Sequence, residues 1–175
     1  MKILIYGINF SPELTGIGKY SGDMAAWLSD AGHDVRVISA PPYYPQWEVD
    51  KRYKSYLYRQ ESVNDLRIWR CPLYVPKHPK GFSRVLHLAS FAISSLPILA
   101  RQLFWKPDVV ICVEPPIFCA PAGLLFSKIL GCKSWLHVQD FEVDAGINLG
   151  LVSSLFARKI VLKFEIWLLE RFDKV

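Results

Sequence analysis

Short apolar segments rich in β-branched residues alternate with segments of helical periodicity along the whole chain, and this alternation limits the possible folds more than any other feature. It is typical of α/β proteins, in which helices connect the parallel strands of one sheet. Right-handed crossovers then favour a doubly wound parallel sheet with the strand order 3-2-1-4-5. The five predicted strands are residues 2–7, 34–40, 66–71, 108–114 and 133–137.

Four segments have the periodicity of helices that pack on a sheet. Gly32 ends the first helix and Gly131 the third, in the position after a helix where glycine is favoured. The second helix carries a narrow polar seam that includes His87, and we expect Pro97 to kink or break it. The predicted helices are residues 19–31, 82–104, 120–130 and 152–172.

The length of 175 residues suits one domain, so we predict a single domain over residues 1–175. Residues 172–175 resemble the start of a sixth strand, and we therefore expect the chain to be a fragment of a longer protein. The N-terminus has neither a long apolar run nor a small-residue cleavage site, which excludes a signal peptide and favours a cytoplasmic location.

The four cysteines, Cys71, Cys112, Cys119 and Cys132, form no C-x-x-C pair and have no nearby histidine that would complete a zinc set. Free Cys is among the most buried residue types. We therefore expect buried free thiols, no metal and no cofactor.

The longest uncharged run, residues 85–100, contains 16 residues. As a helix it would extend about 24 Å, which is less than the roughly 30 Å thickness of a hydrocarbon core. It also contains His87, Ser90 and Pro97. We predict no transmembrane segment from this run.

Basic residues are concentrated in residues 51–84, which contain nine Lys and Arg and only two Asp and Glu, whereas the whole chain has a net charge of +5. Tyrosines and tryptophans lie in and beside this segment. Three interpretations stay open: a solvated insertion, a surface for anionic lipid or a phosphorylated acceptor, and a nucleic-acid surface. Because no RNA-binding signature or DNA-reading motif accompanies the charge, we expect no nucleic-acid partner.

Ligands of doubly wound sheets bind at the carboxyl edge where the strand order reverses. Three loops are predicted to meet there, residues 8–18, 115–119 and 138–146. They follow the first, fourth and fifth strands and form the candidate site.

The first of these loops ends in Thr15-Gly16-Ile17-Gly18-Lys19. Thr15 is placed to cap the next helix, and the glycines allow an anion to approach its N-terminal N–H groups. Glu13 and Tyr20 do not fit a P-loop, and Ser21 does not fit the dinucleotide fingerprint, which disfavours NTPase and NAD functions. A simple tight turn remains the alternative.

The fifth strand leads into His137, Asp140 and Glu142. A single histidine is more often structural than catalytic, but His137 lies at the carboxyl end of an internal strand, three positions before Asp140. A hydroxyl acceptor needs an imidazole or carboxylate to orient it and to receive its proton. We therefore predict His137 and Asp140 as catalytic residues and Thr15, Gly16, Gly18, Lys19 and Glu142 as substrate-binding residues.

The chain resembles the amino-terminal domain of GT-B glycosyltransferases of the family-4 type. The similar segments are KILIYGINFSPELTGIGKYSGDMAAWLSDAGHDVRVISAPPYYP, PDVVICVEPP and WLHVQDFEVDAGINLG, so the resemblance covers nearly the whole sequence. It implies a Rossmann-like domain that mainly binds the acceptor, and a second domain, outside this chain, that binds the nucleotide-sugar donor.

The resemblance also implies individual roles. Gly16 and Gly18 would contact the donor diphosphate, and His137 would contact the transferred sugar. Transfer would be retaining and without a metal, and this chain alone would be inactive because the paired glutamates of the family lie in the second domain.

The acceptor in such exopolysaccharide pathways is often a lipid-linked saccharide, which implies peripheral binding to the inner face of the cytoplasmic membrane. Residues 51–84 and 152–172 are the segments expected to bind anionic lipid. Two further functions stay open: a non-catalytic membrane-surface or acceptor-binding module, and a nucleotide-dependent oxidoreductase, which the absence of an acid after the second strand disfavours.

Overall fold

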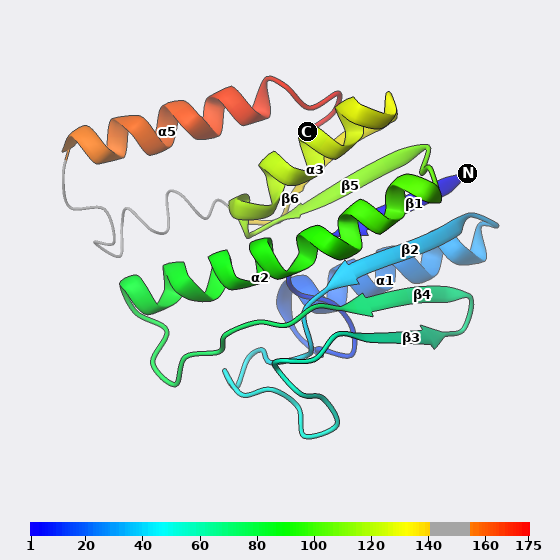
Figure 1. The fold of residues 1–175 in the computed structure, drawn as a ribbon, viewed down its shortest axis with the longest axis horizontal. Coiled ribbons are helices and arrows are strands. Elements are labelled where there is room, and N and C mark those ends of the chain that lie inside the picture. The colour runs from blue at the N-terminus through cyan, green and yellow to red at the C-terminus, as the bar shows by residue number, and fades with distance from the viewer. Residues whose placement is uncertain (141–154) are drawn as a thin grey trace.

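The computed structural model describes residues 1–140 and 155–175, which form a sheet covered by helices on both faces (Figure 1). The sheet has six strands in the order β3-β4-β2-β1-β5-β6. The strands are β1 (Lys2–Tyr6), β2 (Asp34–Ser39), β3 (Arg59–Val63), β4 (Leu66–Arg70), β5 (Val109–Glu114) and β6 (Lys133–Val138). The five predicted strands are therefore confirmed, and they pair in parallel in the predicted order.

The predicted doubly wound parallel sheet is confirmed, with one antiparallel strand at an edge that was not predicted. β3 pairs with β4 in antiparallel register, with Val63 opposite Leu66, so the sheet is mixed. The sequence of β3 is Arg-Gln-Glu-Ser-Val, and none of its five residues is buried. Because a solvated edge strand lacks the apolar run that marks an internal strand, the sequence did not predict it.

The helices are α1 (Gly16–Asp30), α2 (Phe82–Arg101), α3 (Ala120–Leu130) and α5 (Leu155–Leu169), with short 3-10 turns at Gln102–Phe104 and Ile117–Cys119. α3 has the predicted bounds, and Gly131 adopts the left-handed conformation at its end. α1 begins three residues before the predicted start. α2 continues through Pro97 instead of breaking there.

Two apolar layers hold the helices on the sheet. α2, α3 and α5 lie on one face, where Phe91, Leu124 and Leu168 belong to one buried cluster. α1 lies on the other face, where Ala25 packs in a second cluster. α3 approaches β5 closely, since a Cβ at Gly123 would lie 2.1 Å from the Sγ of Cys112.

The described C-terminal residues return to the sheet beside β6. Lys174 forms a parallel bridge with Trp135, and the Asp173 carboxylate accepts hydrogen bonds from the N–H and the hydroxyl of Ser134. This agrees with the predicted strand-like character of residues 172–175. Predicted helical residues 152–154 lie outside the described residues, and α5 ends at Leu169 instead of continuing to residue 172.

All four cysteines are free thiols; Cys71, Cys112 and Cys119 are buried, and Cys132 is half-buried. Burial raises the pKa of both Cys71 and Cys112 to about 12, so these thiols are protonated and unreactive. The prediction of buried free thiols is thus confirmed for three of the four.

α2 is attached to the sheet through its polar seam. His87 is fully buried; its Nδ1–H donates to the carbonyl of Tyr74, and its Nε2 accepts from the hydroxyl of Tyr43. The hydroxyls of Ser95 and Tyr6 lie 2.6 Å apart.

Among the described residues, the continuous helical segment Phe82–Phe104 has 23 residues and is long and apolar enough to cross a membrane by length and composition. Length and composition alone do not test the sequence-based prediction of no transmembrane segment, which stays a prediction.

Burial lowers the pKa of His87 below its usual value. The unfolded chain therefore takes up a proton more readily, and the free energy of unfolding should fall by up to about 1.4 kcal/mol per pH unit as the pH drops below about 6.5. Urea titrations at pH 5 and pH 7.5 measure this. His87→Asn should reduce the slope, and the exposed control His78→Gln should keep it. An equal slope in both variants would contradict this role of His87.

Candidate functional site

A hollow of about 300 Å³ lies at the carboxyl edge of the sheet, next to the first turn of α1. It is lined by Asn9, Gly16, Ile17, Tyr20, Tyr44, Gln139 and Asp140. These residues come from the segments after β1, β2 and β6. The structure therefore brings two of the predicted site residues, Gly16 and Asp140, to one hollow at the expected edge.

The first turn of α1 provides hydrogen-bond donors to this hollow. Gly16 has a φ of +60°, a conformation that favours glycine, and follows the N-cap residue Thr15. The first N–H groups of a helix have no partner within it, and the helix dipole places partial positive charge at this end. Thr15 is extended, as an N-cap residue should be, but its side chain makes no capping hydrogen bond, so the predicted cap is wrong in this respect. The N–H groups of the first turn remain suited to an anion.

Gly18 is inside α1, and its missing side chain leaves room for Glu13. A Cβ at Gly18 would lie 2.3 Å from Oε2 and 2.7 Å from Cβ of Glu13. The buried Glu13 carboxylate accepts hydrogen bonds from the backbone N–H groups of Tyr43 and Tyr44, both at 3.1 Å, and from the side-chain amide of Asn9 at 2.9 Å. Burial raises the pKa of Glu13, although these donors oppose the increase. Glu13 thus connects the loop after β1 to the segment after β2.

Arg70 strengthens the same connection from β4. Its side chain is 2% exposed, and its Nε donates to Glu61 of β3 at 2.6 Å. Its Nη1 donates to the hydroxyl of Ser39 and its Nη2 to the carbonyl of Ser11. The guanidinium therefore joins β3, the end of β2 and the loop after β1 beneath the site.

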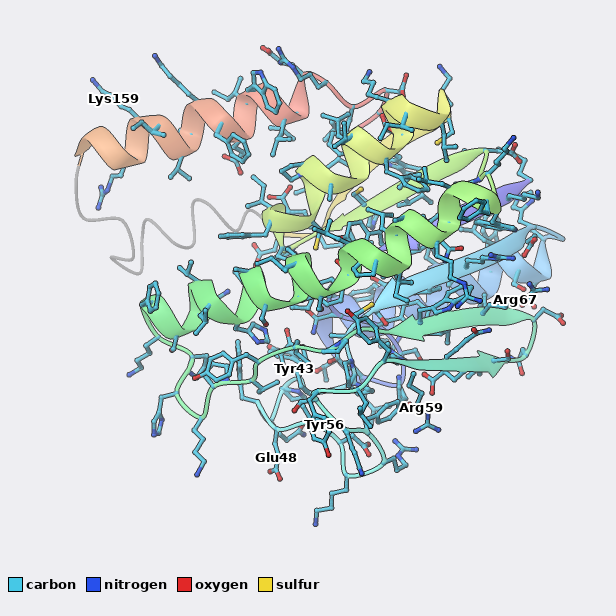
Figure 2. All side chains as sticks on the ribbon, viewed as in Figure 1. Tyr43, Glu48, Tyr56, Arg59, Arg67 and Lys159 are labelled. Atoms are coloured by element: carbon cyan, nitrogen blue, oxygen red, sulfur yellow. The ribbon has the colours of Figure 1, made fainter. Side chains whose placement is uncertain are left out.

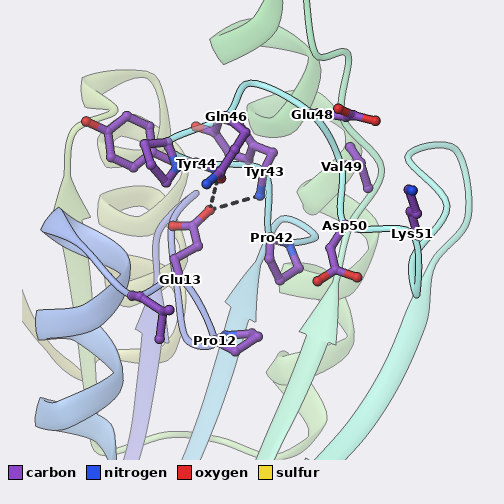
Figure 3. A pocket seen from close by; sticks show the side chains of 12 residues that line it. Pro12, Glu13, Pro42, Tyr43, Tyr44, Gln46, Glu48, Val49, Asp50 and Lys51 are labelled. Carbon is purple, nitrogen blue, oxygen red and sulfur yellow. Dashed lines mark hydrogen bonds between the residues drawn. The ribbon is translucent and has the colours of Figure 1, made fainter.

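A second hollow of about 460 Å³ adjoins the first, and Tyr44 lines both (Figure 3). Its walls combine ring and aliphatic surface from Pro12, Pro42 and Val49 with the polar side chains of Gln46 and Asp50. Figure 3 shows the two hydrogen bonds by which Glu13 holds Tyr43 and Tyr44 between these walls. Apolar surface beside a few hydrogen-bonding groups is typical of pockets that bind small molecules.

The remaining predicted site residues are distributed differently. Lys19 is half exposed and forms an ion pair with Asp23 at 2.6 Å on the outer surface of α1. His137 lies near the end of β6, half-buried, with its ring edge-on to Trp135 at 6.0 Å, and it does not line the hollow of Gly16 and Asp140. Partial burial lowers its pKa. Glu142 lies outside the described residues.

The loop after β5 contributes to the core instead of to this hollow. Ile117 and Cys119 are buried in the cluster beneath α2 and α3. The third wall comes from Tyr44, in the proline-rich exit from β2. The prolines in the sequence correctly indicated where β2 ends. The prediction of the site did not include Tyr44, although it lies between those prolines. Glu13 was considered only as a mismatch to the P-loop motif.

The basic segment 51–84 is partly neutralised by carboxylates. Arg70 and Arg59 face Glu61, and Arg52 pairs with Asp50 at 2.7 Å. The loop that precedes β3 extends beyond the carboxyl edge, with Glu48 and Tyr56 on it and Tyr43 closer to α2 (Figure 2).

Among residues 1–140 and 155–175, no group of three or more His, Cys, Asp or Glu is arranged to hold a metal ion.

A doubly wound sheet with a glycine-led helix N-terminus at its switch point defines a class of α/β domains that bind phosphorylated ligands. Comparison with protein families identifies the member of this class. Residues 15–175 match the model of the glycosyl transferase 4-like domain, and the chain belongs to that family.

Two curated proteins are similar in sequence. The putative colanic acid biosynthesis glycosyl transferase WcaI of Escherichia coli K12 is 57% identical over 151 residues, which are 86% of this chain and 37% of that protein. Glycogen synthase 1 of Synechocystis sp. is 26% identical over 132 residues, which are 64% of this chain and 27% of that protein. The matched stretches thus span 37% and 27% of the lengths of these two relatives.

Solved structures agree on the fold. The match to the sucrose-phosphate synthase of Thermosynechococcus elongatus covers 99% of this chain and 41% of the synthase chain, with a TM-score of 0.61 and 14% identity. A second match is the catalytic domain of Starch Synthase IV from Arabidopsis thaliana, bound to ADP and acarbose. It covers 81% of this chain and 34% of the synthase chain, with a TM-score of 0.56 and 18% identity. The predicted resemblance to GT-B glycosyltransferases of the family-4 type is confirmed.

Proposed function

We propose that this chain is the acceptor-side half of a retaining glycosyltransferase that moves a sugar from a nucleotide-sugar to a lipid-linked saccharide in the synthesis of a colanic acid-like exopolysaccharide. The observation that carries the proposal is the 57% identity to WcaI, taken together with the hollow in which Gly16 and Asp140 meet. The reaction needs no cofactor, because the nucleotide-sugar is a substrate, and we propose that it needs no metal.

The N-terminus of α1 suits the leaving group of this reaction. Cleavage of the bond between sugar and diphosphate develops negative charge on the departing phosphate. Gly16 and Ile17 line the hollow from the first turn of α1, and the N–H groups of that turn would stabilise the charge without reorganising. In this proposal Thr15 and Gly18 shape the turn, and Lys19 would contact the substrate by exchanging its ion pair with Asp23 for one with the phosphate.

Asp140 suits the acceptor. Its position in the same hollow as Gly16 would place an acceptor hydroxyl close to the anomeric carbon, which is a contribution through positioning. His137 is the proposed contact for the transferred sugar, and Glu142 a further contact. The neighbouring hollow beside Tyr44 and Gln46 is the proposed place for the remaining acceptor saccharide.

The lipid part of the acceptor would keep the enzyme peripherally bound to the inner face of the cytoplasmic membrane. The donor nucleotide would be held mainly by a second domain outside this chain, and the chain alone would then not transfer sugar. The alternative is a non-catalytic membrane-surface or acceptor-binding module.

A chimera tests the proposal. The stretch of WcaI that matches this chain is replaced by the corresponding residues of this chain, and colanic acid is measured in an E. coli strain that lacks WcaI. We expect the chimera to restore production, and Asp140→Asn to lower it by about tenfold or more because the acceptor hydroxyl is no longer oriented by a carboxylate.

Asp30→Asn, at the other end of α1, serves as the control and should keep full production. A folded chimera that restores nothing would favour the non-catalytic module. Full production by the Asp140→Asn chimera would remove Asp140 from the site.

A further inference from the structure

The outer face of α2 carries a continuous row of exposed apolar side chains. Its members are Phe82, Leu86, Ile93 and Leu96 of α2 and Phe104 of the 3-10 turn that follows, which we call the apolar stripe. Ile93 is 67% exposed and Phe104 is 90% exposed. The spacing of four, seven and three positions places the four α2 residues on one side of the helix. α2 therefore exposes an apolar face to solvent, a feature that marks an interaction surface.

The buried face of the same segment is apolar around Phe91, and it also carries polar side chains that bond to the sheet layer. His87 bonds to Tyr43, Ser95 to Tyr6, and the side-chain carbonyl of Gln102 accepts from Arg36 at 3.0 Å. These three contacts hold the helix flat against the sheet along its length. Inserting α2 across a bilayer would break all three hydrogen bonds. The orientation of the helix therefore suits contact with the membrane surface and not a transmembrane position.

α3 extends the apolar face. It packs beside α2 over the same side of the sheet, and Leu125 and Ile129 are 62% and 63% exposed. Side chains that point away from the sheet on two adjacent helices lie on the same side of the molecule. The apolar stripe is thus the centre of a broader face.

The charges on this face have a single sign. Residues 77–101, which include α2, contain Lys77, Lys80, Arg84 and Arg101 but no Asp or Glu, and α3 contains Lys128 but no Asp or Glu. Lys77, Lys80 and Arg84 precede or begin α2, next to the exposed Phe82. A second copy of this face would bring like charges together, whereas anionic headgroups complement them.

We infer that the apolar stripe of α2, with Leu125 and Ile129 beside it, is the surface by which the protein rests on an anionic lipid bilayer. The stripe enters the boundary between headgroups and acyl chains, and the lysines and arginine at its start contact the headgroups. This inference rests on the proposed lipid-linked acceptor and assigns the membrane contact to α2 and α3, where sequence reasoning had favoured residues 51–84 and the last helix.

The stripe is well placed for such an acceptor. His87 contacts Tyr43 and Tyr74, which follow the carboxyl ends of β2 and β4, so the N-terminal half of α2 lies at the edge that holds both hollows. Trp105, after the other end, donates to Asp34 at the start of β2. Phe82 and Leu86 are therefore the part of the stripe nearest the proposed acceptor site, where a lipid carrier would leave the membrane.

Flotation of the full 175-residue chain with vesicles tests the inference. Vesicles of phosphatidylcholine with about 30% phosphatidylglycerol should carry the chain, and vesicles of phosphatidylcholine alone should carry much less. Ile93→Gln/Leu96→Gln should weaken binding to the anionic vesicles by about tenfold or more, because both side chains lose apolar area that enters the bilayer. Lys77→Gln/Lys80→Gln/Arg84→Gln should also weaken it.

The matched control is Trp27→Gln, since Trp27 is 69% exposed on α1, on the opposite face of the sheet. It should bind as the unchanged chain does. Circular dichroism verifies that each variant is folded. We expect all of them to fold, because the altered side chains are exposed.

Equal loss of binding in the α2 and Trp27 variants, or undiminished binding of the α2 variants, would overturn the inference. So would a dimer that the Ile93→Gln/Leu96→Gln change converts to a monomer, because the face would then bind a second copy. Vesicle binding needs no sugar transfer, so a failed chimera with normal flotation would contradict only the proposed function.

Discussion

Replacing Arg70 by alanine is expected to lower the free energy of unfolding by about 3–5 kcal/mol, the range for removing one partner of a buried ion pair. The side chain is 2% exposed, and its partner Glu61 is 14% exposed. Without the guanidinium, the mostly buried Glu61 carboxylate keeps only the longer 3.9 Å ion pair with Arg59, and the carbonyls of Ser11 and Ala40 lose a donor. Chemical denaturation of the chain at pH 7 measures the change.

Arg67 provides the matched control. It lies on the same strand, three residues earlier, and is exposed (Figure 2). Arg67→Ala should change stability by no more than about 0.5 kcal/mol, as surface substitutions usually do. Similar losses for the two variants would show that the burial of Arg70 is not the source of its effect.

The effect of Arg70 should extend to the site. Its contacts with Ser11 and Ser39 hold the loop after β1 against the end of β2, and these segments form walls of both hollows. In the chimera with WcaI, Arg70→Ala should therefore lower colanic acid production even at a temperature where the protein remains folded. The residue is a positioning residue, because it does not line either of the two hollows.

The parts of the fold that sequence predicted are those in which burial dominates. Strands such as Lys2–Tyr6 and Val109–Glu114 are covered on both faces, so their apolar runs reflect their environment directly. β3 has no such run because it lies at a solvated edge. Its existence depends on pairing with β4, which local composition does not encode.

The start of α1 shows a second limit. Glycine has low helix propensity, so the segment through Gly18 was predicted as a loop. In the structure Gly18 lies within α1, and its missing side chain leaves the space that the buried Glu13 occupies. A tertiary contact therefore overrides the local preference, and only the three-dimensional neighbours reveal the reason for the glycine.

The site was predictable to the extent that topology determines it. Parallel strands end at one edge, which brought Gly16 and Asp140 together as expected. The contribution of Tyr44 was not predictable in this way, because it depends on how the segment after β2 folds back over Glu13. Hydrogen bonds from two consecutive backbone N–H groups to a buried carboxylate leave no pattern in the sequence.

Replacing Gly18 by alanine should test this arrangement and is expected to destabilise the chain by about 3 kcal/mol, the upper end of the cost of overpacking a tight contact. The new Cβ would lie 2.7 Å from the Glu13 Cβ, so a rotation of the carboxylate alone cannot relieve the clash. Glu13 would have to move away from the N–H groups of Tyr43 and Tyr44, and buried N–H groups without partners add to the cost.

A double-mutant cycle separates the clash from a general intolerance of alanine at this position. Glu13→Ala should itself be destabilising, because it removes the acceptor of two backbone N–H groups. In the Glu13→Ala background, however, Gly18→Ala should cost about 1 kcal/mol or less, because the atoms that it would meet are gone. Denaturation midpoints of the four chains give the coupling free energy. A cost of Gly18→Ala that is the same in both backgrounds would mean that Gly18 is required for another reason, such as direct contact of its N–H group with a ligand, and the assignment of Glu13 as its structural partner would fail.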